Sequence, residues 1–571
     1  MKRVIKPFFI GLSVVFSGVQ AHAAGGEFST LTYNIAGLPE ILSSAESDRQ
    51  QATEQISCYV NEFDVVNVQE DFNYHAALYD TCDNHPYRSP TSGGAGIGSG
   101  LNTMSRFSYE DWARVTWDNC ADEDCLTPKG FTLARMQLQN GVFVDIYNLH
   151  TQAQTEDDDL AARRANVLQL ADYIETHSAG NAVIIMGDTN TRYTRSGDNI
   201  REFLHRGFTD AWLQLIHTDD IPASGADALV CSPAVTDANC EIVDKVLYRD
   251  NGYLGLLAYD YDVREDAINS DGEELSDHRP VETDWSYDTN DDWQFSARVG
   301  GPHGSEFNDF ALLPEQPSVR KITLRSGSRV DQVQITLDNG YIMTHGGDGG
   351  SAQSLTLNSG EYLTSVTLCS GKYNDHTRVF YAALRTSQNR TLSGGSSTDS
   401  CATYSADSGW SIVGFHGRSG DEIDKLGVIY APVVSAMTQA TYVQLINAAS
   451  GLCLDIANGE MTDGSNIELW NCSGAAWQQW NYDDHTGLIR SQQDPQYCLD
   501  NSGSFADGAN LIISTCTGNV HQRFTINAGG TISMRSMSEQ VIDAYGTSAG
   551  DNIGTWTFWG GSNQYWQLQA W

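Results

Sequence analysis

The stretch Ile184–Arg192, IIMGDTNTR, decides how the first part of the chain folds. The five residues 182–186, AVIIM, have the length and β-branched content of a buried strand. Gly187 follows, and then a carboxylate and a carboxamide two residues apart, Asp188 and Asn190. Because residues two apart in an extended chain point the same way, we expect both side chains to face one site.

Five further stretches place polar side chains directly after apolar segments, which makes six such strand ends in all. They are LTYNIAG with Asn34, DVVNVQED with Glu70, VFVDIYNLH with His150, EIVDKVLYR with Asp244, and LSDHRPVE with Asp277 and His278. In α/β folds, functional groups gather where strands end and loops begin. The six strand ends are therefore predicted to build one site.

Residues 24–287 alternate apolar strands with polar helices, which predicts an α/β domain. One amphipathic helix is marked by Leu160, Val167, Leu168, Ala171 and Ile174. With the six strand ends in this order, the segment resembles the endonuclease/exonuclease/phosphatase superfamily, which shares the DNase I fold. The resemblance implies a four-layer α/β sandwich that hydrolyses phosphoesters.

Cleavage of a phosphodiester requires neutralised charge, an activated water and a protonated leaving oxygen. Hard oxygen ligands such as Glu70, together with Asn34, suit Mg²⁺. Other divalent cations are the alternative. The resemblance places Asp277 on the metal side of the site. A magnesium-dependent reaction is the expectation.

The remaining strand-end residues receive roles in water activation and proton transfer. Asp188 is expected to position or deprotonate the attacking water, and Asn190 to hydrogen-bond the phosphoryl oxygens. His150 and His278 are expected to donate to the phosphate or to transfer the proton, with Asp244 orienting His278.

Two local motifs favour one branch of this superfamily. CLTPKGFTLARM, with Lys129 before Gly130, is similar to the K-G segment of secreted sphingomyelinases, where a lysine lies near the phosphate. HTQAQ, beginning at His150, resembles the same branch. A solvated turn lysine is the alternative for Lys129. The leading hypothesis is a sphingomyelinase C-type phosphodiesterase, and an extracellular DNase is the alternative.

The chain carries 73 Asp plus Glu against 33 Lys plus Arg, a formal net charge of −40. Such a surface repels phosphodiester polymers, so no stable nucleic-acid complex is expected. The expected partners are a phospholipid or other phosphodiester, cell-surface glycans, and a membrane surface that aromatic loop tips such as Trp112 and Trp117 could contact.

The N-terminus has the pattern of a secretory signal peptide over residues 1–23. Lys2, Arg3 and Lys6 precede the apolar run 8–16, and Ala21-His22-Ala23 matches a small-residue cleavage site. The mature protein is therefore expected to be secreted.

Twelve cysteines in an exported chain predict disulfides. Sequential pairing gives Cys58/Cys82, Cys120/Cys125, Cys231/Cys240, Cys369/Cys401, Cys453/Cys472 and Cys498/Cys516. A cysteine-ligated zinc site is the alternative, which the lack of any C-x-x-C spacing disfavours.

After a polar linker, DTNDD at 288–292, residues 293–432 consist of short β-like runs punctuated by glycine. VGGPHGSEF, HGGDGG and IVGFHGRSGDEIDKLGVIY resemble jacalin-type β-prism lectins. The family's sugar loop, G-x-x-x-D, corresponds to Gly420–Asp424 and faces the glycine loop at Gly300 and Gly301. Asp421 and Glu422 stand where some relatives carry aromatic residues, which bears on sugar preference.

A motif recurs three times in residues 441–571: CLDIANG at Cys453, CLDNSG at Cys498 and VIDAYG at Val541, each followed by a Q-x-aromatic closure. The repeat resembles the ricin-type β-trefoil lectins, in which an Asp, an aromatic ring and an Asn bind a sugar. The expected ligands are Asp455, Trp470 and Asn471 in the first lobe and Asp543 and Trp556 in the third, where Thr557 replaces Asn.

The second lobe has Ser514 at the aromatic position and is expected to be inactive. Two lectin-like segments favour delivery of an enzyme to glycan-coated surfaces. A lectin or adhesin that carries an inactive hydrolase module is the alternative from another functional class.

Overall fold

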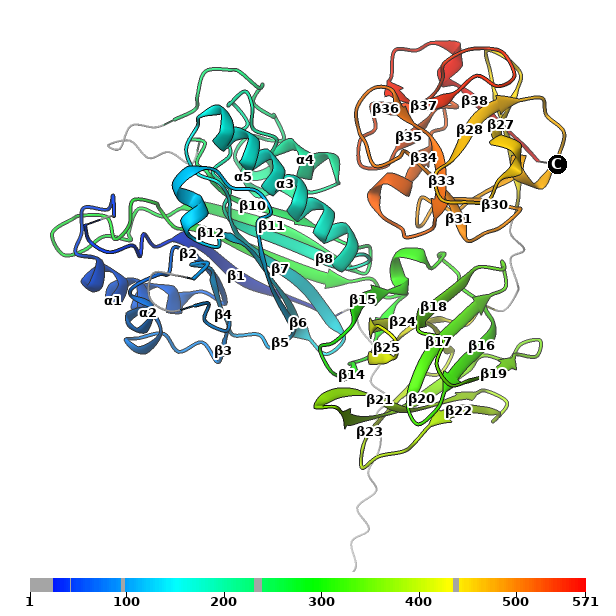
Figure 1. The fold of residues 1–571 in the computed structure, drawn as a ribbon, viewed down its shortest axis with the longest axis horizontal. Coiled ribbons are helices and arrows are strands. Elements are labelled where there is room, and N and C mark those ends of the chain that lie inside the picture. The colour runs from blue at the N-terminus through cyan, green and yellow to red at the C-terminus, as the bar shows by residue number, and fades with distance from the viewer. Residues whose placement is uncertain (1–23, 42, 94–97, 231–238, 435–440, 571) are drawn as a thin grey trace, which may run out of the picture.

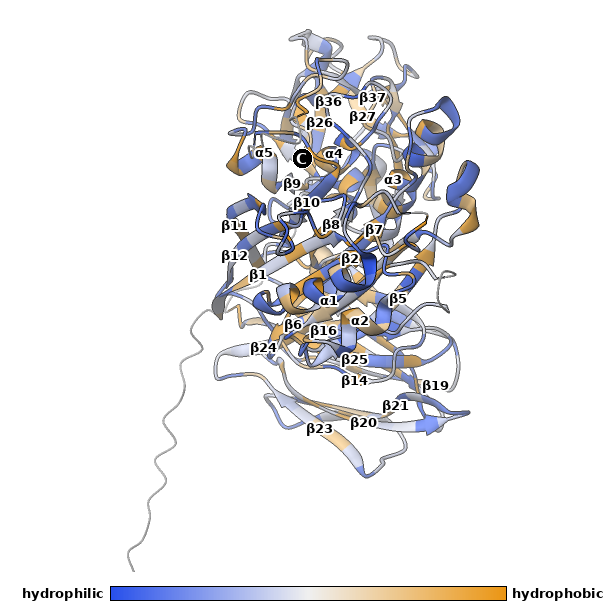
Figure 2. Ribbon diagram, turned by 90° about the vertical axis from the view of Figure 1, so that its left-hand side faces the viewer, coloured by the Kyte–Doolittle hydropathy of each residue, from blue (hydrophilic) through white to orange (hydrophobic). Residues whose placement is uncertain are grey.

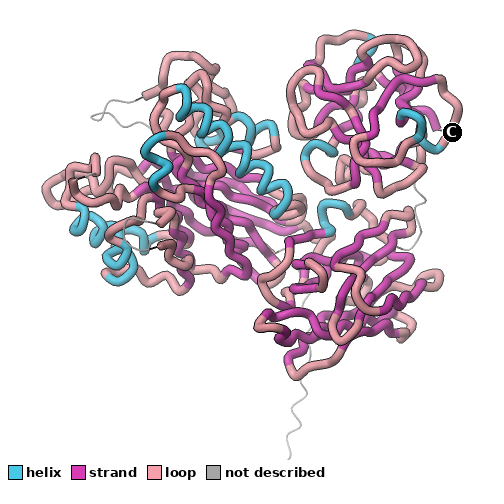
Figure 3. The backbone as a smooth tube through the Cα atoms, viewed as in Figure 1, coloured by secondary structure: helices cyan, strands magenta, loops and turns pink. Residues whose placement is uncertain are grey.

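The structure is a computed structural model that describes residues 24–41, 43–93, 98–230, 239–434 and 441–570. The predicted signal peptide, residues 1–23, lies outside this part of the chain. The described residues form three domains, with the middle and C-terminal domains on the same side of the N-terminal one (Figure 1). All five α-helices in this part of the chain belong to the N-terminal domain, and the other two domains consist of strands and loops with single 3₁₀ turns (Figure 3).

The N-terminal domain contains two six-stranded sheets. The first has the order β11 (Leu254–Val263), β12 (Val281–Thr289), β1 (Gly25–Asn34), β2 (Val65–Gln69), β4 (Asn102–Ser105) and β3 (Tyr87–Arg88). The second has the order β5 (Tyr109–Thr116), β6 (Gly130–Gln139), β7 (Val142–His150), β8 (Ala182–Asp188), β10 (Asp244–Arg249) and β9 (Thr209–Asp210).

Helices cover the outer face of each sheet. Helices α1 (Arg49–Tyr59) and α2 (His75–Asp80) pack on the first sheet, and α3 (Asp157–His177), α4 (Arg201–His205) and α5 (Ala211–Leu215) on the second. These helices carry hydrophilic as well as hydrophobic residues, as amphipathic helices do (Figure 2). The predicted four-layer α/β sandwich is confirmed.

The apolar face of α3 differs from the prediction at one position. Val167, Ala171 and Ile174 are buried as expected, but Leu168 is 42% exposed, and Leu170 is buried in its place. Residues 167, 170, 171 and 174 follow the helical repeat, whereas 168 lies one step outside that stripe.

The middle domain is the predicted β-prism, built from three sheets. Its strands are β13 (Gln294–Phe295), β14 (Val299–Gly300), β15 (Ser305–Asn308), β24 (Trp410–Ser419) and β25 (Ile423–Pro432) in one sheet, β16 (Val319–Ser326), β17 (Val330–Leu337), β18 (Ile342–Gly346) and β19 (Ser351–Thr356) in the second, and β20 (Leu363–Tyr373), β21 (His376–Thr386), β22 (Thr391–Gly395) and β23 (Ser400–Ser405) in the third. Alternating residues such as Val333, Ile335 and Leu337 point into the core between the sheets.

The C-terminal domain has the predicted threefold trefoil architecture. Its strands are β26 (Val443–Asn447), β27 (Cys453–Ile456), β28 (Ser465–Trp470), β29 (Trp480–Tyr482), β30 (Ile489–Ser491), β31 (Tyr497–Asp500), β32 (Ala509–Asn510), β33 (Ile512–Thr515), β34 (Phe524–Ile526), β35 (Ile532–Met534), β36 (Gln540–Ala544), β37 (Ile553–Thr557) and β38 (Trp566–Ala570). The closing aromatic residues of the three repeats, Trp480, Phe524 and Trp566, are buried together in one core.

Five of the six predicted disulfides form as sequential pairs: Cys58–Cys82, Cys120–Cys125, Cys369–Cys401, Cys453–Cys472 and Cys498–Cys516. Each of these bridges stays within one domain. The sixth predicted pair, Cys231 with Cys240, is not among them, because Cys231 lies outside the described residues. Cys240 itself is buried and disulfide-bonded, and its pairing with Cys231 stays a prediction.

Two sequence-based expectations are corrected by the fold. Asp288 and Thr289, predicted to be linker, belong to β12, because Asp288 pairs with Gly25 of β1. Trp112 and Trp117 are not exposed loop tips: Trp112 lies within β5, and Trp117 is buried with its indole N–H donating to the carbonyl of His150 at 2.7 Å.

Within the described residues, no helix is long and apolar enough to cross a membrane.

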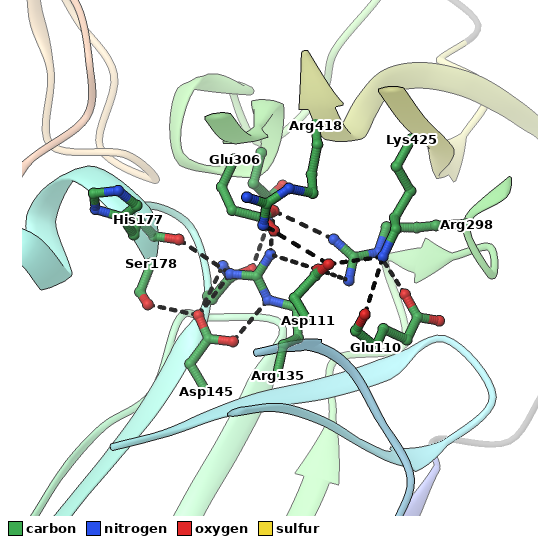
Figure 4. A network of polar contacts seen from close by, with 12 residues as sticks. Glu110, Asp111, Arg135, Asp145, His177, Ser178, Arg298, Glu306, Arg418 and Lys425 are labelled. Atoms are coloured by element: carbon green, nitrogen blue, oxygen red, sulfur yellow. Dashed lines mark hydrogen bonds and ion pairs between the residues drawn. The ribbon is translucent and has the colours of Figure 1, made fainter. Parts of the chain in front are cut away.

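The N-terminal and middle domains are joined by a buried network of charges (Figure 4). Asp111 of β5 accepts from Arg298 at 2.6 Å and from Lys425 of β25 at 2.7 Å. Glu306 of β15 pairs with Arg135 of β6 on the N-terminal side. Because such charges are stable in the interior only when paired, the network fixes how the two domains dock.

Candidate functional site

Strand register brings the predicted site residues of the second sheet side by side. His150, the last residue of β7, is the parallel partner of Asp188, the last residue of β8. Asp244, the first residue of β10, is the antiparallel partner of the same Asp188. Three polar groups therefore lie side by side at one end of three neighbouring strands.

The first sheet contributes Asn34 and Glu70 to the same place. Thr30, Thr32 and Asn34 alternate along β1 and are all buried, on the face turned toward the second sheet. The amide of Asn34 donates to Glu70 at 3.1 Å and to Asp188 at 3.1 Å. This side chain thus links the ends of both sheets.

Asp188 lies at the centre of the site and is 1% exposed. One carboxylate oxygen, Oδ1, accepts the backbone N–H of Asn190 at 3.0 Å. The other, Oδ2, lies 3.4 Å from His150 Nε2 and 3.8 Å from His278 Nε2. Burial raises the pKa of the Asp188 carboxyl to about 6, against the lowering effect of His278.

His278 is oriented by Asp244, as predicted. Its Nδ1 lies 2.9 Å from the Asp244 carboxylate, which leaves Nε2 facing Asp188. Burial disfavours the charged ring, but the carboxylates of Asp244 and Asp188 outweigh it and hold the pKa of His278 well above its ordinary value. The Nε2 atom of His278 therefore faces Asp188 on a ring whose charged form is favoured.

Lys129 reaches into the site from the residue before β6. It is 8% exposed, so it is not a solvated turn lysine, and its Nζ lies 3.1 Å from His150 Nε2. Burial, followed by the nearby charge of Lys129, holds the pKa of His150 well below its ordinary value. Here His150 is a neutral ring beside a fixed cation.

Asp124 is a member of this cluster that the sequence analysis did not single out. Its carboxylate pairs with Lys129 at 2.7 Å and accepts the backbone N–H of Ala153 at 2.7 Å. The Cys120–Cys125 bridge closes the short loop that carries it. The available signal was the position of Asp124 between two bridged cysteines five positions apart, shortly before Lys129.

Asn190 lies in the site for a different reason from the one predicted. The strand ends at Asp188, and Asn190 takes a positive φ of 49°, in an Asx-type turn closed by Asp188. Its side-chain amide donates to the carbonyl of Thr151 at 3.4 Å. Glu70, also directly after a strand, has a φ of 59°. Such backbone conformations are unfavourable for residues other than glycine and cluster at functional sites.

The donor set fits a hard divalent cation. Burial raises the pKa of Glu70, and a bound cation would stabilise its charged form. One carboxylate oxygen of Asp244 has no hydrogen-bond partner within the described part of the chain. Asp188, Asp244 and His278 also have one possible ligand atom each within 4.8 Å of one another, but the raised pKa of His278 disfavours the neutral ring that a metal ligand requires. Asp277 lies at the margin of the site, with an exposed carboxylate that accepts from Ser44 and Ser276.

Family models match three consecutive parts of the chain. Endonuclease/Exonuclease/phosphatase family 2 matches residues 38–242, the jacalin-like lectin domain matches 296–429, and the ricin-type beta-trefoil lectin domain matches 441–566. The N-terminal domain is therefore similar to the endonuclease/exonuclease/phosphatase family. A jacalin-like domain and a trefoil domain follow it.

Sequence matches to individual proteins cover the first and the second of these parts. The chain is 38% identical over 285 residues to sphingomyelinases of Mycobacterium tuberculosis and Mycobacterium bovis, covering 48% of this chain and 56% of theirs. The chain thus spans about half the length of these relatives. Horcolin from Hordeum vulgare is 28% identical over 139 residues, covering 23% of this chain and 93% of its own. Beta toxin from Staphylococcus aureus is similar in structure, at 16% identity and a TM-score of 0.34, covering 45% of this chain and 99% of that chain.

The predicted sugar loop of the jacalin-like domain is engaged by the protein itself. Asp424 is buried, its carboxylate pairs with Arg378, and its carbonyl accepts the N–H of Gly301 at 2.8 Å. Arg329 donates to Glu422 at 2.5 Å. The carboxylate expected to clamp sugar hydroxyls is therefore already ion-paired. Gly420 and Asp421 are the exposed members of the loop.

In the first trefoil lobe, two of the predicted ligand residues contact Gln478. In the first lobe Asp455 accepts from Gln478 at 2.6 Å, and Asn471 contributes only its carbonyl, to the same Gln478. Trp470 is exposed as predicted. Burial raises the pKa of Asp455 to about 6.

The third lobe has its amide at a residue that the sequence analysis missed. Asn563 donates to Asp543 at 2.7 Å, so Thr557 is not the equivalent of the binding Asn. Trp556 and Trp559 are exposed beside them, and the Trp559 indole N–H reaches Asp543 at 3.4 Å. In the sequence, Asn563 stands directly before the Gln of the third Q-x-aromatic motif, and this position could have identified it. The same position holds Trp477 in the first lobe and His521 in the second.

Proposed function

We propose that this protein is a secreted, Mg²⁺-dependent phosphodiesterase of the sphingomyelinase C type, brought to glycan-bearing surfaces by its two lectin domains. The observation that carries the proposal is the cluster of Lys129, His150 and Asp188, in which a buried cation and a neutral imidazole flank the carboxylate at the strand ends. The K-G motif that supplies Lys129 favours the sphingomyelinase branch, and the 38% identity to sphingomyelinases supports it.

In this proposal the side chains of the site divide the chemistry. Asp188 orients the attacking water and takes its proton, a role that suits a carboxylate with a raised pKa. Lys129 stabilises charge that develops on the phosphoryl oxygens, aided by the amide of Asn190. His278, charged and aimed by Asp244, donates a proton to the leaving oxygen. The ceramide-type alcohol would leave as the neutral product.

Glu70, with Asn34 fixing its carboxylate, would hold the cation, and Asp277 lies close enough to influence the pKa of Glu70. When bound, Mg²⁺ neutralises phosphate charge and polarises the phosphoryl group. Burial of the site between two sheets excludes bulk water and strengthens these electrostatic effects.

The test is a parallel assay of the mature protein on sphingomyelin liposomes and on plasmid DNA, with Mg²⁺ or with a chelator. We expect phosphocholine release that the chelator abolishes and Mg²⁺ restores, with the plasmid intact. Nicked plasmid with untouched liposomes would replace the proposal with an extracellular nuclease. Glycan binding without either activity would favour a lectin with an inactive hydrolase module.

A further inference from the structure

A cavity of about 280 Å³ lies between the N-terminal domain and the trefoil domain, away from the site described above. The N-terminal domain lines it with the end of α3 and the loops that follow α4 and β10, and the trefoil domain lines it with residues between 518 and 536. Its charged lining comprises Arg206, Arg249, Arg523, Arg535, Glu175 and Asp250. Four guanidinium groups against two carboxylates make it a positive site in a protein whose net charge is −40.

The two arginines of the N-terminal domain are already paired. Arg249 donates to Glu175 at 2.6 Å, and the other oxygen of Glu175 accepts the N–H of Val520 at 3.4 Å. Arg206 pairs with Asp172 and with Glu202, each at 2.8 Å. Both carboxylate oxygens of Glu175 are therefore engaged, and its charge opposes the lowered pKa of Arg523 only in part.

The two arginines of the trefoil domain are not matched by carboxylates in the same way. Arg523 donates its Nε to the carbonyl of Gly518 at 2.8 Å and has no ion-pair partner among the described residues. Arg535 donates to the carbonyl of His485 at 2.8 Å, and its nearest carboxylate, on the 90% exposed Asp484, is 4.0 Å away. Burial, followed by repulsion from Arg249, lowers the pKa of Arg523 to about 10. The charge of Arg523 is thus under-compensated.

We propose that this cavity binds a phosphate or sulfate group, which joins the N-terminal and trefoil domains. A planar guanidinium group offers paired N–H donors that match such an oxyanion, and an anion would compensate Arg523 and Arg535 together. The volume is at the lower limit for a small-molecule pocket, which suits one oxyanion with a few waters. This inference does not depend on the proposed phosphodiesterase activity.

The cavity is separated from the phosphodiesterase site by the length of α3. Asp159, in the first turn of this helix, accepts from Gln152, two residues beyond His150. Glu175 lies 16 residues further along, a distance of about 24 Å at 1.5 Å per residue. Binding in the cavity can therefore be distinguished from phosphate binding at the strand ends.

Two measurements on the full mature chain test the inference. Crystals soaked in tungstate, an oxyanion visible by anomalous scattering, are expected to show a peak in this cavity beside Arg523 and Arg535. Titration calorimetry with inorganic phosphate, in chelator and at constant ionic strength, is expected to show one-site binding that R523Q weakens at least tenfold. The control R385Q removes an equally positive but exposed group of the jacalin-like domain and is expected to bind normally.

If R523Q does not fold, R535Q takes its place, with the same expected loss. Repeating the titration with phosphocholine and with inorganic sulfate identifies the source of the group: tighter binding of phosphocholine points to a phosphomonoester, and equal or weaker binding points to a free anion. No tungstate peak in the cavity, or phosphate binding that is unchanged in both arginine variants, would overturn the inference.

Discussion

The Nζ atom of Lys129 lies 3.1 Å from Nε2 of His150, and both groups are buried beside Asp188. Burial, and then the nearby charge of Lys129, hold the pKa of His150 well below its ordinary value and favour the neutral ring. The ammonium group of Lys129 faces the place where the phosphate of a substrate would bind. The contact joins the start of β6 to the end of β7.

Replacing Lys129 with Met removes the charge and keeps most of the side-chain volume. We expect turnover to fall on the order of 100-fold, the size typical of losing one group that stabilises transition-state charge. Phosphocholine release from liposomes measures it, and Lys372→Met, an exposed lysine of β20, serves as the control. Equal turnover by K129M would remove Lys129 from the site.

Asp244→Asn keeps the shape of the side chain that orients His278 but removes its charge. The pKa of His278 should then fall toward its ordinary value, because Asp244 is the main group that raises it. We expect turnover to fall on the order of 100-fold or more, and the alkaline limb of the pH–rate profile to move to lower pH. An unchanged pH profile would argue against His278 as the proton donor.

The charge network between the N-terminal and jacalin-like domains makes a stability prediction. Asp111 is 3% exposed, and its removal leaves Arg298 and Lys425 buried without a full complement of carboxylates. We expect Asp111→Ala to lower the free energy of unfolding by about 3–5 kcal/mol. Denaturant unfolding measures it, with Asp266→Ala, in an exposed ion pair with Arg264, expected to change it by less than about 1 kcal/mol.

His416 lies at the same interface and makes stability depend on pH. Burial, followed by the charges of Arg298 and Arg135, holds the pKa of His416 well below its ordinary value of about 6.5. The unfolded chain therefore takes up a proton below pH 6.5 that the folded chain does not, so stability falls as the pH falls.

The His416→Gln variant should lose this contribution. Between pH 7 and pH 5 we expect its unfolding free energy to decrease less steeply than that of the wild type, by up to about 1.4 kcal/mol per pH unit. Gln388→Asn, an exchange at an exposed position that involves no titratable group, should leave the slope unchanged. Parallel slopes for the wild type and H416Q would show that His416 is also charged in the folded state.

The trefoil domain offers a matched comparison between lobes. Asn563→Ala removes the amide that donates to Asp543, and we expect glycan binding by the full chain to weaken at least tenfold. Asp500→Ala changes the equivalent aspartate of the second lobe, where Ser514 replaces the aromatic ring, and should have no effect. A glycan array followed by titration with the best ligand measures both. A loss with D500A instead would assign binding to the second lobe.

The sequence determined by itself those features that depend on local spacing. The β-branched run before Asp188 specifies a strand end, and the recurring Q-x-aromatic motif specifies the lobes. Cysteines close along the chain specify the bridges. Such patterns are set by the two- or 3.6-residue period and by short loops, so they are visible without the fold.

Tertiary structure decided which of these residues meet, and how. Asn190 reaches the site through a turn rather than through strand alternation, and Asn563 rather than Thr557 supplies the amide of the third lobe. Arg378 pairs with the loop carboxylate of Asp424, 46 residues away. Each of these outcomes depends on the path of a loop or on an ion pair between distant segments, which residue spacing does not encode.

The docking of domains was the least visible in the sequence. Asp111 and Arg298 are 187 residues apart, and nothing near either residue marks the other as its partner. The same holds for the arginines that converge on the cavity between the N-terminal and trefoil domains. A charged side chain looks the same in sequence whether it is solvated or buried, and only the packing of whole domains determines which charges lose water and must find a partner.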